Sequence, residues 1–191
     1  MLIRRASFVC FFTLSMTNAL AAAPSASEAR RFVAAYRVDE TIALVARDAI
    51  YEASMQEGPH KQFYACVNSH LTAATFHQLA VEVVQQEFSD AQRLQDAVGF
   101  FETETGRKLR DSTVEVLRQR PIRRYAGKPL TQPGDYPISP AEYVKVKEFE
   151  KLPAYQDFRR FREAINAIGE SPSIQAPLKE VQTTCSSPQK K

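Results

Sequence analysis

The stretch Phe88–Leu109 reads FSDAQRLQDAVGFFETETGRKL and carries the clearest fold signals in the chain. Its segment 89–92, SDAQ, resembles a capping box, in which the first residue and the residue three positions later satisfy the free N–H groups of a starting helix. Apolar residues then follow at helical spacing, at Leu94, Ala97 and Phe101. The stretch therefore predicts an amphipathic helix.

Similar signals lie on both sides of this stretch. Segment 25–28, SASE, is another capping box, and the apolar-periodic run after it predicts helix as far as Gly58. Residues 60–87 contain neither Gly nor Pro and predict a second long helix, while 89–120 predicts a third, which Gly106 could bend. Because no strand-like alternation interrupts these runs, we predict an all-α fold.

Beyond residue 120 the pattern changes. The segment 121–138 contains four Pro and two Gly, and we interpret it as a linker or extended loop after a helical domain at 25–120. A second helical unit at 139–168 opens with a Ser-Pro-Ala-Glu capping box and is interrupted near Pro153. An irregular tail is expected at 169–191. The expected architecture is a helical bundle of about four long, partly kinked helices, with the second unit packed on the first.

The third and fourth helical units resemble each other at an offset of 49 residues. Small or helix-breaking residues fall in the same zone of each unit, since Gly106 pairs with Tyr155 and Glu104 pairs with Pro153. We interpret this as a weak internal repeat of a helix-bend-helix unit. The apolar pairs are Leu94 with Tyr143, Ala97 with Val146, Phe100 with Phe149, Leu109 with Phe158, and Val116 with Ile165.

The N-terminal residues 1–21 have the features of a cleaved signal peptide. Arg4 and Arg5 precede a short apolar core, and Ala-Leu-Ala at 19–21 matches a cleavage site, so the mature chain is expected to begin near Ala22. The apolar core is too short for a membrane anchor, and no transmembrane segment is expected in the mature chain. We therefore expect a periplasmic protein, with full secretion left open.

The expected export to an oxidising compartment predicts that the cysteines form a disulfide. Cys10 leaves with the signal peptide, so only Cys66 and Cys185 remain in an oxidising compartment, and we expect them to form a disulfide. Closing a loop of this length stabilises a fold by roughly 2 to 5 kcal/mol. The C-x-x-C spacing of a catalytic dithiol is absent from the sequence.

The segment from Phe88 onward resembles the bacterial family called domain of unknown function 2059. Phe100-Phe101 match an aromatic pair of that family, and Gly106, Lys108 and Leu109 match the end of its F-Y-x-S-P-x-G-Q-K-L type bend, although residues 103–105 and Arg107 depart from the pattern. The resemblance is best over 81–117. It implies an exported helical protein, and it transfers no catalytic residue because the family has no established activity.

Residues that could support catalysis or bind a metal are few. His70 and His77 lie seven apart, with Cys66 one turn earlier, but this is not the spacing of a zinc motif, and we predict no metal site. Glu102 and Glu104 are two apart on a helix and point in different directions. Neither a G-x-S-x-G motif nor a Gly-rich phosphate loop occurs. We therefore predict no catalytic residue and no cofactor.

The basic segment 118–128, RQRPIRRYAGK, is the strongest candidate for partner binding. Arginine side chains bind phosphate and carboxylate groups bidentately, so such a segment could dock an anionic lipid, a glycolipid or an acidic envelope protein. The net charge of +3, which becomes +1 without Arg4 and Arg5, does not favour nucleic acid. A second basic cluster, at 159–162, is expected on the polar face of the last helix. The candidate binding residues are Arg118, Arg120, Arg123, Arg124 and Lys128.

These features favour a non-catalytic interaction or accessory protein of the envelope. An envelope hydrolase is the alternative, and it would require a pocket that brings together His77, Glu82, Glu87 or Glu102. A small-lipid carrier is a further alternative, and it would require an apolar space between helices. Five phenylalanines are expected in the core, or else beside a shallow groove between the two repeated units: Phe100, Phe101, Phe149, Phe158 and Phe161.

Overall fold

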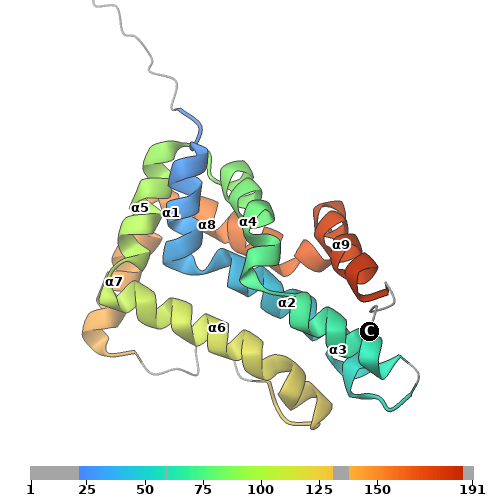
Figure 1. Cartoon of the computed structure of the whole chain (residues 1–191). Helices are drawn as coiled ribbons and strands as arrows, with labels where there is room; N and C mark the ends of the chain where they lie inside the picture. The colour runs from blue at the N-terminus through green and yellow to red at the C-terminus, as the bar shows by residue number, and fades with distance from the viewer. Residues whose placement is uncertain (1–21, 59, 131–137, 187–191) are drawn as a thin grey trace, which may run out of the picture.

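The computed structural model describes residues 22–58, 60–130 and 138–186, and the expected signal peptide lies outside them. Within these ranges the chain is all helical, without strands, so the predicted fold class is confirmed. None of the described helices is both long enough and apolar enough to cross a membrane. The α-helices, shown in Figure 1, are α1 (Ala26–Tyr36), α2 (Val38–Met55), α3 (Lys61–His70), α4 (Ala73–Glu87), α5 (Ala91–Phe101), α6 (Glu104–Tyr125), α7 (Pro140–Glu150), α8 (Pro153–Asn166) and α9 (Gln175–Ser186).

A bundle of about four long helices is not confirmed, because each expected unit divides into two helices. Arg37 adopts the left-handed conformation between α1 and α2. Thr72 and Thr103 each accept a hydrogen bond from the N–H three residues later, and so begin α4 and α6 as new helices. A side-chain cap can therefore divide one apolar-periodic run into two helices while the spacing of the apolar residues stays helical.

Two further expectations from the sequence are wrong. Pro121 does not end the third unit, because α6 continues to Tyr125 with Pro121 buried inside it. Packing of α6 along α2 outweighs the loss of one backbone hydrogen bond. The tail is also more regular than expected: a short 3₁₀ helix, η3 (Pro172–Ile174), leads into α9, and Ile174 and Val181 are buried. Residues 131–137 of the expected linker lie outside the described part.

One hydrophobic core contains residues from both halves of the chain. Helix α1 lies between α4 and α5 (Figure 1) and contributes Phe32 and Tyr36. The ring of Phe32 meets that of Phe161 edge-on at 5.4 Å, and Tyr36 meets Phe158 in the same way at 5.3 Å. Aromatic contacts of this kind connect α1 with α8, so the two halves are not separate domains.

The helix boundaries support the internal repeat. Helix α7 begins 49 residues after α5 begins, and α8 begins 49 residues after α6 begins. The break between the helices of each pair thus falls at equivalent positions. Phe100 and Phe149, which are equivalent, stack on each other with ring centroids 4.1 Å apart.

Gly106 allows the first repeat to turn tightly. It lies in the first turn of α6, and a Cβ atom there would lie 2.1 Å from the carbonyl oxygen of Phe100 and 2.6 Å from the Cα of Phe101. Only a residue without a side chain fits so close to the end of α5. The turn itself lies before Gly106, at Glu102 and Thr103, rather than at the glycine.

A buried carboxylate joins α8 to the start of α5. Asp157 has no exposed surface, and it accepts hydrogen bonds from the backbone N–H of Ser89 at 2.9 Å and from its hydroxyl at 2.6 Å. Arg160 and Arg93 approach the other carboxylate oxygen at 2.8 and 3.3 Å. Ser89 is thus used for this contact, and the cap of α5 is Asp90 rather than Ser89.

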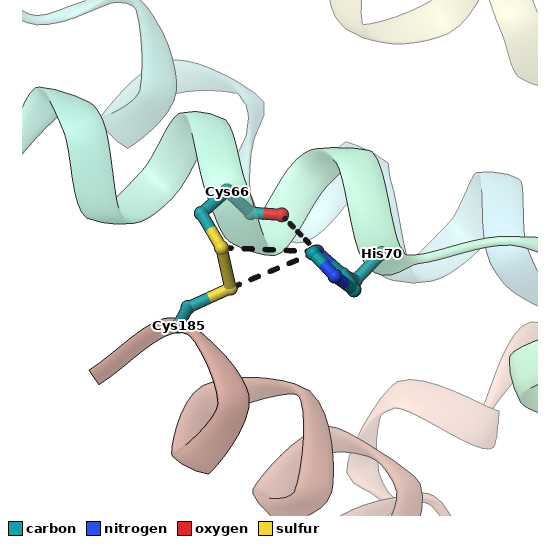
Figure 2. A group of neighbouring side chains, drawn as sticks. All are labelled: Cys66, His70 and Cys185. Carbon is teal, nitrogen blue, oxygen red and sulfur yellow. Dashed lines mark hydrogen bonds between the residues drawn. A yellow bond between two sulfur atoms is a disulfide. The ribbon is translucent and has the colours of Figure 1, made fainter. Parts of the chain in front are cut away.

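Cys66 and Cys185 lie at disulfide distance, as the sequence predicts, with Cα atoms 5.8 Å apart and a sequence separation of 119 positions. The bridge joins α3 to α9 at the end of the molecule opposite α5 and α7 (Figures 1 and 2). Because few α9 side chains are buried, the bridge is a major part of what holds this helix in place.

Candidate binding groove between helices α6 and α8

The basic residues predicted from the sequence lie on the last turns of α6 rather than on a loop, except Lys128, which follows that helix. Two of them have acidic partners in the fold. Arg118 pairs with Glu115 at 2.7 Å and with Glu40 at 3.3 Å, and Arg124 pairs with Asp48 at 2.7 Å. These two arginines therefore hold α6 on α2 and are not free to bind a partner.

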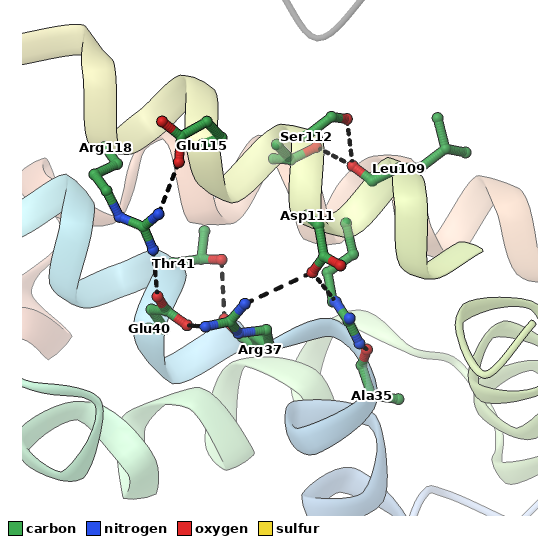
Figure 3. Close-up of polar contacts among 11 residues, drawn as sticks. Ala35, Arg37, Glu40, Thr41, Leu109, Asp111, Ser112, Glu115 and Arg118 are labelled. Carbon is green, nitrogen blue, oxygen red and sulfur yellow. Dashed lines mark hydrogen bonds and ion pairs between the residues drawn. The ribbon is translucent and has the colours of Figure 1, made fainter. Parts of the chain in front are cut away.

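The ion pairs of Arg118 belong to a larger polar network (Figure 3). Glu40 also pairs with Arg37, which in turn lies 3.6 Å from Asp111 of α6. Arg110 completes the network, because it pairs with Asp111 at 2.8 Å and donates to the carbonyl of Ala35 at 3.0 Å. The network fixes the junction of α1 and α2 against α6, and so sets the position of the helix that forms one wall of the groove described next.

The remaining basic residues differ in their surroundings. Arg123 donates to the carbonyl of Pro129 at 3.0 Å, and Lys128 is exposed. Arg120 is half-buried and lines a cavity of about 380 Å³ between α6 and α8. Arg118 and Arg124 line smaller cavities, of about 300 and 220 Å³, so Arg120 is the predicted residue in the cavity of about 380 Å³.

The lining of this first cavity is both polar and apolar. Arg120, Arg162 and Asn166 supply polar groups, and the apolar walls include Phe161 and Ile165. Three pairs of lining residues are equivalent positions of the two repeats: Thr113 with Arg162, Val116 with Ile165, and Leu117 with Asn166.

A second cavity, of about 180 Å³, lies beside the first and shares Tyr36, Thr113 and Arg162 with it. We call the two cavities together the α6–α8 groove. Aromatic residues make up half of the lining of the second cavity and include Phe100, Phe101, Phe149, Tyr155 and Phe158. All of these phenylalanines except Phe100 are buried, so the rings both fill the core and line the groove.

Tyr36 and Arg162 determine the electrostatics of the groove. Burial raises the pKa of Tyr36 above its ordinary value, while the nearby guanidinium of Arg162 and a hydrogen bond with Thr113 act in the opposite direction. The phenol is therefore neutral at physiological pH. Arg162 is exposed, and it takes part in none of the ion pairs among the described residues. Glu150, which pairs with Lys147, is the acidic residue in the lining of the second cavity.

Arg162 and Tyr36 were not predicted as site residues. The sequence pattern placed Arg162 on the polar face of the last helix, and it placed Tyr36 on the apolar face of the first helix. The repeat carried the signal that could have found Arg162. At an offset of 49 residues it corresponds to Thr113, one turn before Leu117 on α6.

The residues that would support an envelope hydrolase are not brought together in this groove. His77 contacts Asp39 at 3.0 Å, and Glu102 pairs with Arg31 at 2.7 Å, which lowers the pKa of Glu102. Glu82 accepts a hydrogen bond from Gln78 on its own helix. None of these acidic or histidine side chains lines either cavity of the groove.

Comparison with known proteins gives no assignment. No protein-family model matches the chain, and neither the curated proteins nor the solved structures contain a match. The resemblance of residues 81–117 to the family of unknown function therefore stays a prediction.

Proposed function

We propose that this chain is an exported, non-catalytic binding protein of the bacterial periplasm that holds a small amphipathic anion in the α6–α8 groove. The observation that carries the proposal is that Arg120 and Arg162 both line one cavity of about 380 Å³, together with apolar residues such as Phe161 and Ile165. Its size falls within the roughly 300 to 1,000 Å³ typical of small-molecule sites. A ligand with an anionic head and an apolar body would match this lining, because its head would bind the two guanidinium groups and its body would contact Phe161.

Physical chemistry favours an anion at this place. A guanidinium group offers several N–H donors in a plane, which suits carboxylate, sulfonate and phosphate groups. Charge-assisted hydrogen bonds of this kind contribute about 1.5 to 3 kcal/mol each. The neutral phenol of Tyr36 and the hydroxyl of Thr113 add polar groups without adding negative charge that would repel such a ligand.

This proposal narrows the interaction role expected from the sequence. Docking through the whole basic segment is disfavoured by the partners of Arg118 and Arg124. A carrier of small lipids agrees with the aromatic second cavity, whereas long acyl chains exceed the described space. We therefore expect a ligand with a short apolar part.

The test measures binding of 8-anilinonaphthalene-1-sulfonate, a fluorescent amphipathic anion, to the folded oxidised chain. We expect one saturable site from which decanoate displaces the probe more effectively than decanol does. Replacing Arg120 and Arg162 together by Gln should weaken binding by about a hundredfold or more, as expected for the loss of two charge-assisted contacts of about 1.5 to 3 kcal/mol each.

Arg159→Gln is the matched control, because Arg159 is exposed on the same helix and lines neither cavity of the groove. Circular dichroism would verify that the variants are folded. Equal affinity of the double variant and the wild type would overturn the proposal, as would equal displacement by decanoate and decanol.

A further inference from the structure

His70 lies next to both sulfur atoms of the disulfide (Figure 2). Its Nδ1 atom is 3.7 Å from Sγ of Cys66 and 3.8 Å from Sγ of Cys185. Cys66 and His70 are one turn apart on α3, whereas Cys185 comes from α9, 115 residues further along the chain than His70. The fold thus gathers two sulfur ligands and one nitrogen ligand at one point, with the three ligand atoms within 4.8 Å of one another.

The spacing of these atoms resembles that of a tetrahedral zinc site. With Zn–S bonds of about 2.3 Å and Zn–N bonds of about 2.0 to 2.1 Å, a ligand nitrogen lies about 3.6 Å from each ligand sulfur. The two Nδ1 to Sγ distances are already close to this value. Of the three distances between the ligand atoms, the one between the two sulfur atoms, which are bonded in the disulfide, would have to increase, to about 3.8 Å.

We propose that the reduced form of the chain binds one Zn²⁺ ion through Cys66, His70 and Cys185, so that a metal bridge replaces the disulfide between α3 and α9. A dithiol reductant supplies two electrons and two protons to the disulfide, giving two thiols, and becomes a disulfide itself. Binding of Zn²⁺ then releases the two thiol protons, leaving two thiolates and one neutral imidazole as ligands.

The surroundings of the three residues suit this exchange. Cys66 and Cys185 are half-buried and His70 is exposed, so reductant and metal can both reach them. In the disulfide form Nδ1 of His70 lies 2.9 Å from the carbonyl oxygen of Cys66 and 3.2 Å from Oγ of Ser69. Metal binding at Nδ1 moves the ring proton to Nε2, which faces away from the sulfur atoms. Water fills the fourth position.

The test uses the full mature chain, reduced with excess dithiol and freed of it by gel filtration without oxygen. Titration with Co²⁺, a spectroscopic substitute for Zn²⁺, should give a thiolate-to-cobalt charge-transfer band that saturates at one ion per chain and is lost when Zn²⁺ is added. The oxidised chain should give no band. His70→Ala should weaken Co²⁺ binding by about tenfold or more, since even groups outside the first coordination sphere contribute about 10- to 100-fold.

His60→Ala is the matched control, because His60 is exposed beside α3 and makes no cap hydrogen bond with its side chain. It should bind Co²⁺ as the wild type does. Alkylation of the thiols provides a second measurement, in which Zn²⁺ should protect both cysteines together. The proposal would be overturned by the absence of a one-to-one complex in the reduced chain, or by equal affinity of His70→Ala and wild type.

Discussion

The rings of Phe100 and Phe149 lie parallel, with centroids 4.1 Å apart and planes inclined by 2°. The two residues are 49 positions apart and lie at equivalent places in α5 and α7. Contact between equivalent positions is the pattern of a two-fold interface at its axis, here within one chain. It explains why equivalent residues of α6 and α8 face each other across the groove.

This stacked pair should be energetically coupled. In a double-mutant cycle with Phe100→Leu and Phe149→Leu, we expect each change to destabilise the fold, and we expect a coupling energy of about 0.5 to 1.5 kcal/mol, which is typical of aromatic pairs. Urea unfolding followed by circular dichroism measures the four free energies. Additive effects would show that the two rings do not interact.

Gly106 should not tolerate a methyl group. Because a Cβ atom there would lie 2.1 Å from a backbone oxygen of α5, Gly106→Ala should destabilise the fold by about 1 to 3 kcal/mol. Gly99→Ala is the control, since nothing lies within 4 Å of a Cβ atom at this helical position. That change should stabilise by about 0.5 to 1 kcal/mol. Thermal unfolding measures both effects, and similar shifts for the two variants would contradict the prediction.

Asp157 should contribute to stability only while it is ionised. Burial raises the pKa of Asp157, but hydrogen bonds from Ser89 and the charges of Arg160 and Arg93 outweigh it, so the pKa lies below its ordinary value. The contribution is therefore present above the pKa of the unfolded chain, about 3.9, and is lost as the pH falls through the lower folded value.

Replacing this residue tests the contribution directly. Asp157→Asn should destabilise the fold by about 1 to 3 kcal/mol at pH 7, since the buried side chain loses its charge while Arg93 and Arg160 keep theirs. The difference from wild type should shrink as the pH falls below 4. Urea unfolding at several pH values measures it, and a constant difference down to pH 2 would argue against the ionised role.

Glu142 should titrate at unusually low pH. Its hydrogen bond with Lys108, followed by those from the backbone and side chain of Ser139, lowers its pKa to about 2. Carbon-detected NMR titration of the folded chain measures this value. Lys108→Gln should raise it towards the ordinary range, whereas Lys145→Gln, a change at an exposed residue of α7, should leave it unaltered. An ordinary pKa in the wild type would show that α6 and α7 are not joined here.

Much of this architecture is local and could be predicted from the sequence. The capping boxes at Ser25 and Ser139 form as expected, because the groups that satisfy each other are three residues apart. The pairing of Cys66 with Cys185 followed from elimination, since the remaining cysteine, Cys10, lies in the expected signal peptide. The sequence also predicted the internal repeat at an offset of 49 residues, and the helix boundaries have the same offset.

Two backbone features depend on tertiary contacts and could not be predicted from the sequence. Arg37 takes a left-handed conformation, unusual for a side chain of its size, where Glu40 and Asp111 hold its guanidinium group. Pro121 stays inside a helix because α2 supports that helix on one side.

The groove and the cysteine-histidine cluster both arise from the packing of helices that are distant in sequence. Arg162, Arg120 and Tyr36 belong to three helices, and His70 meets Cys185 across 115 residues of sequence. Helical periodicity records which face of a helix is apolar, but it does not record which two faces meet. The sequence by itself therefore determined the all-helical class and the covalent bridge, and the packing of the helices determined where charge and apolar surface come together.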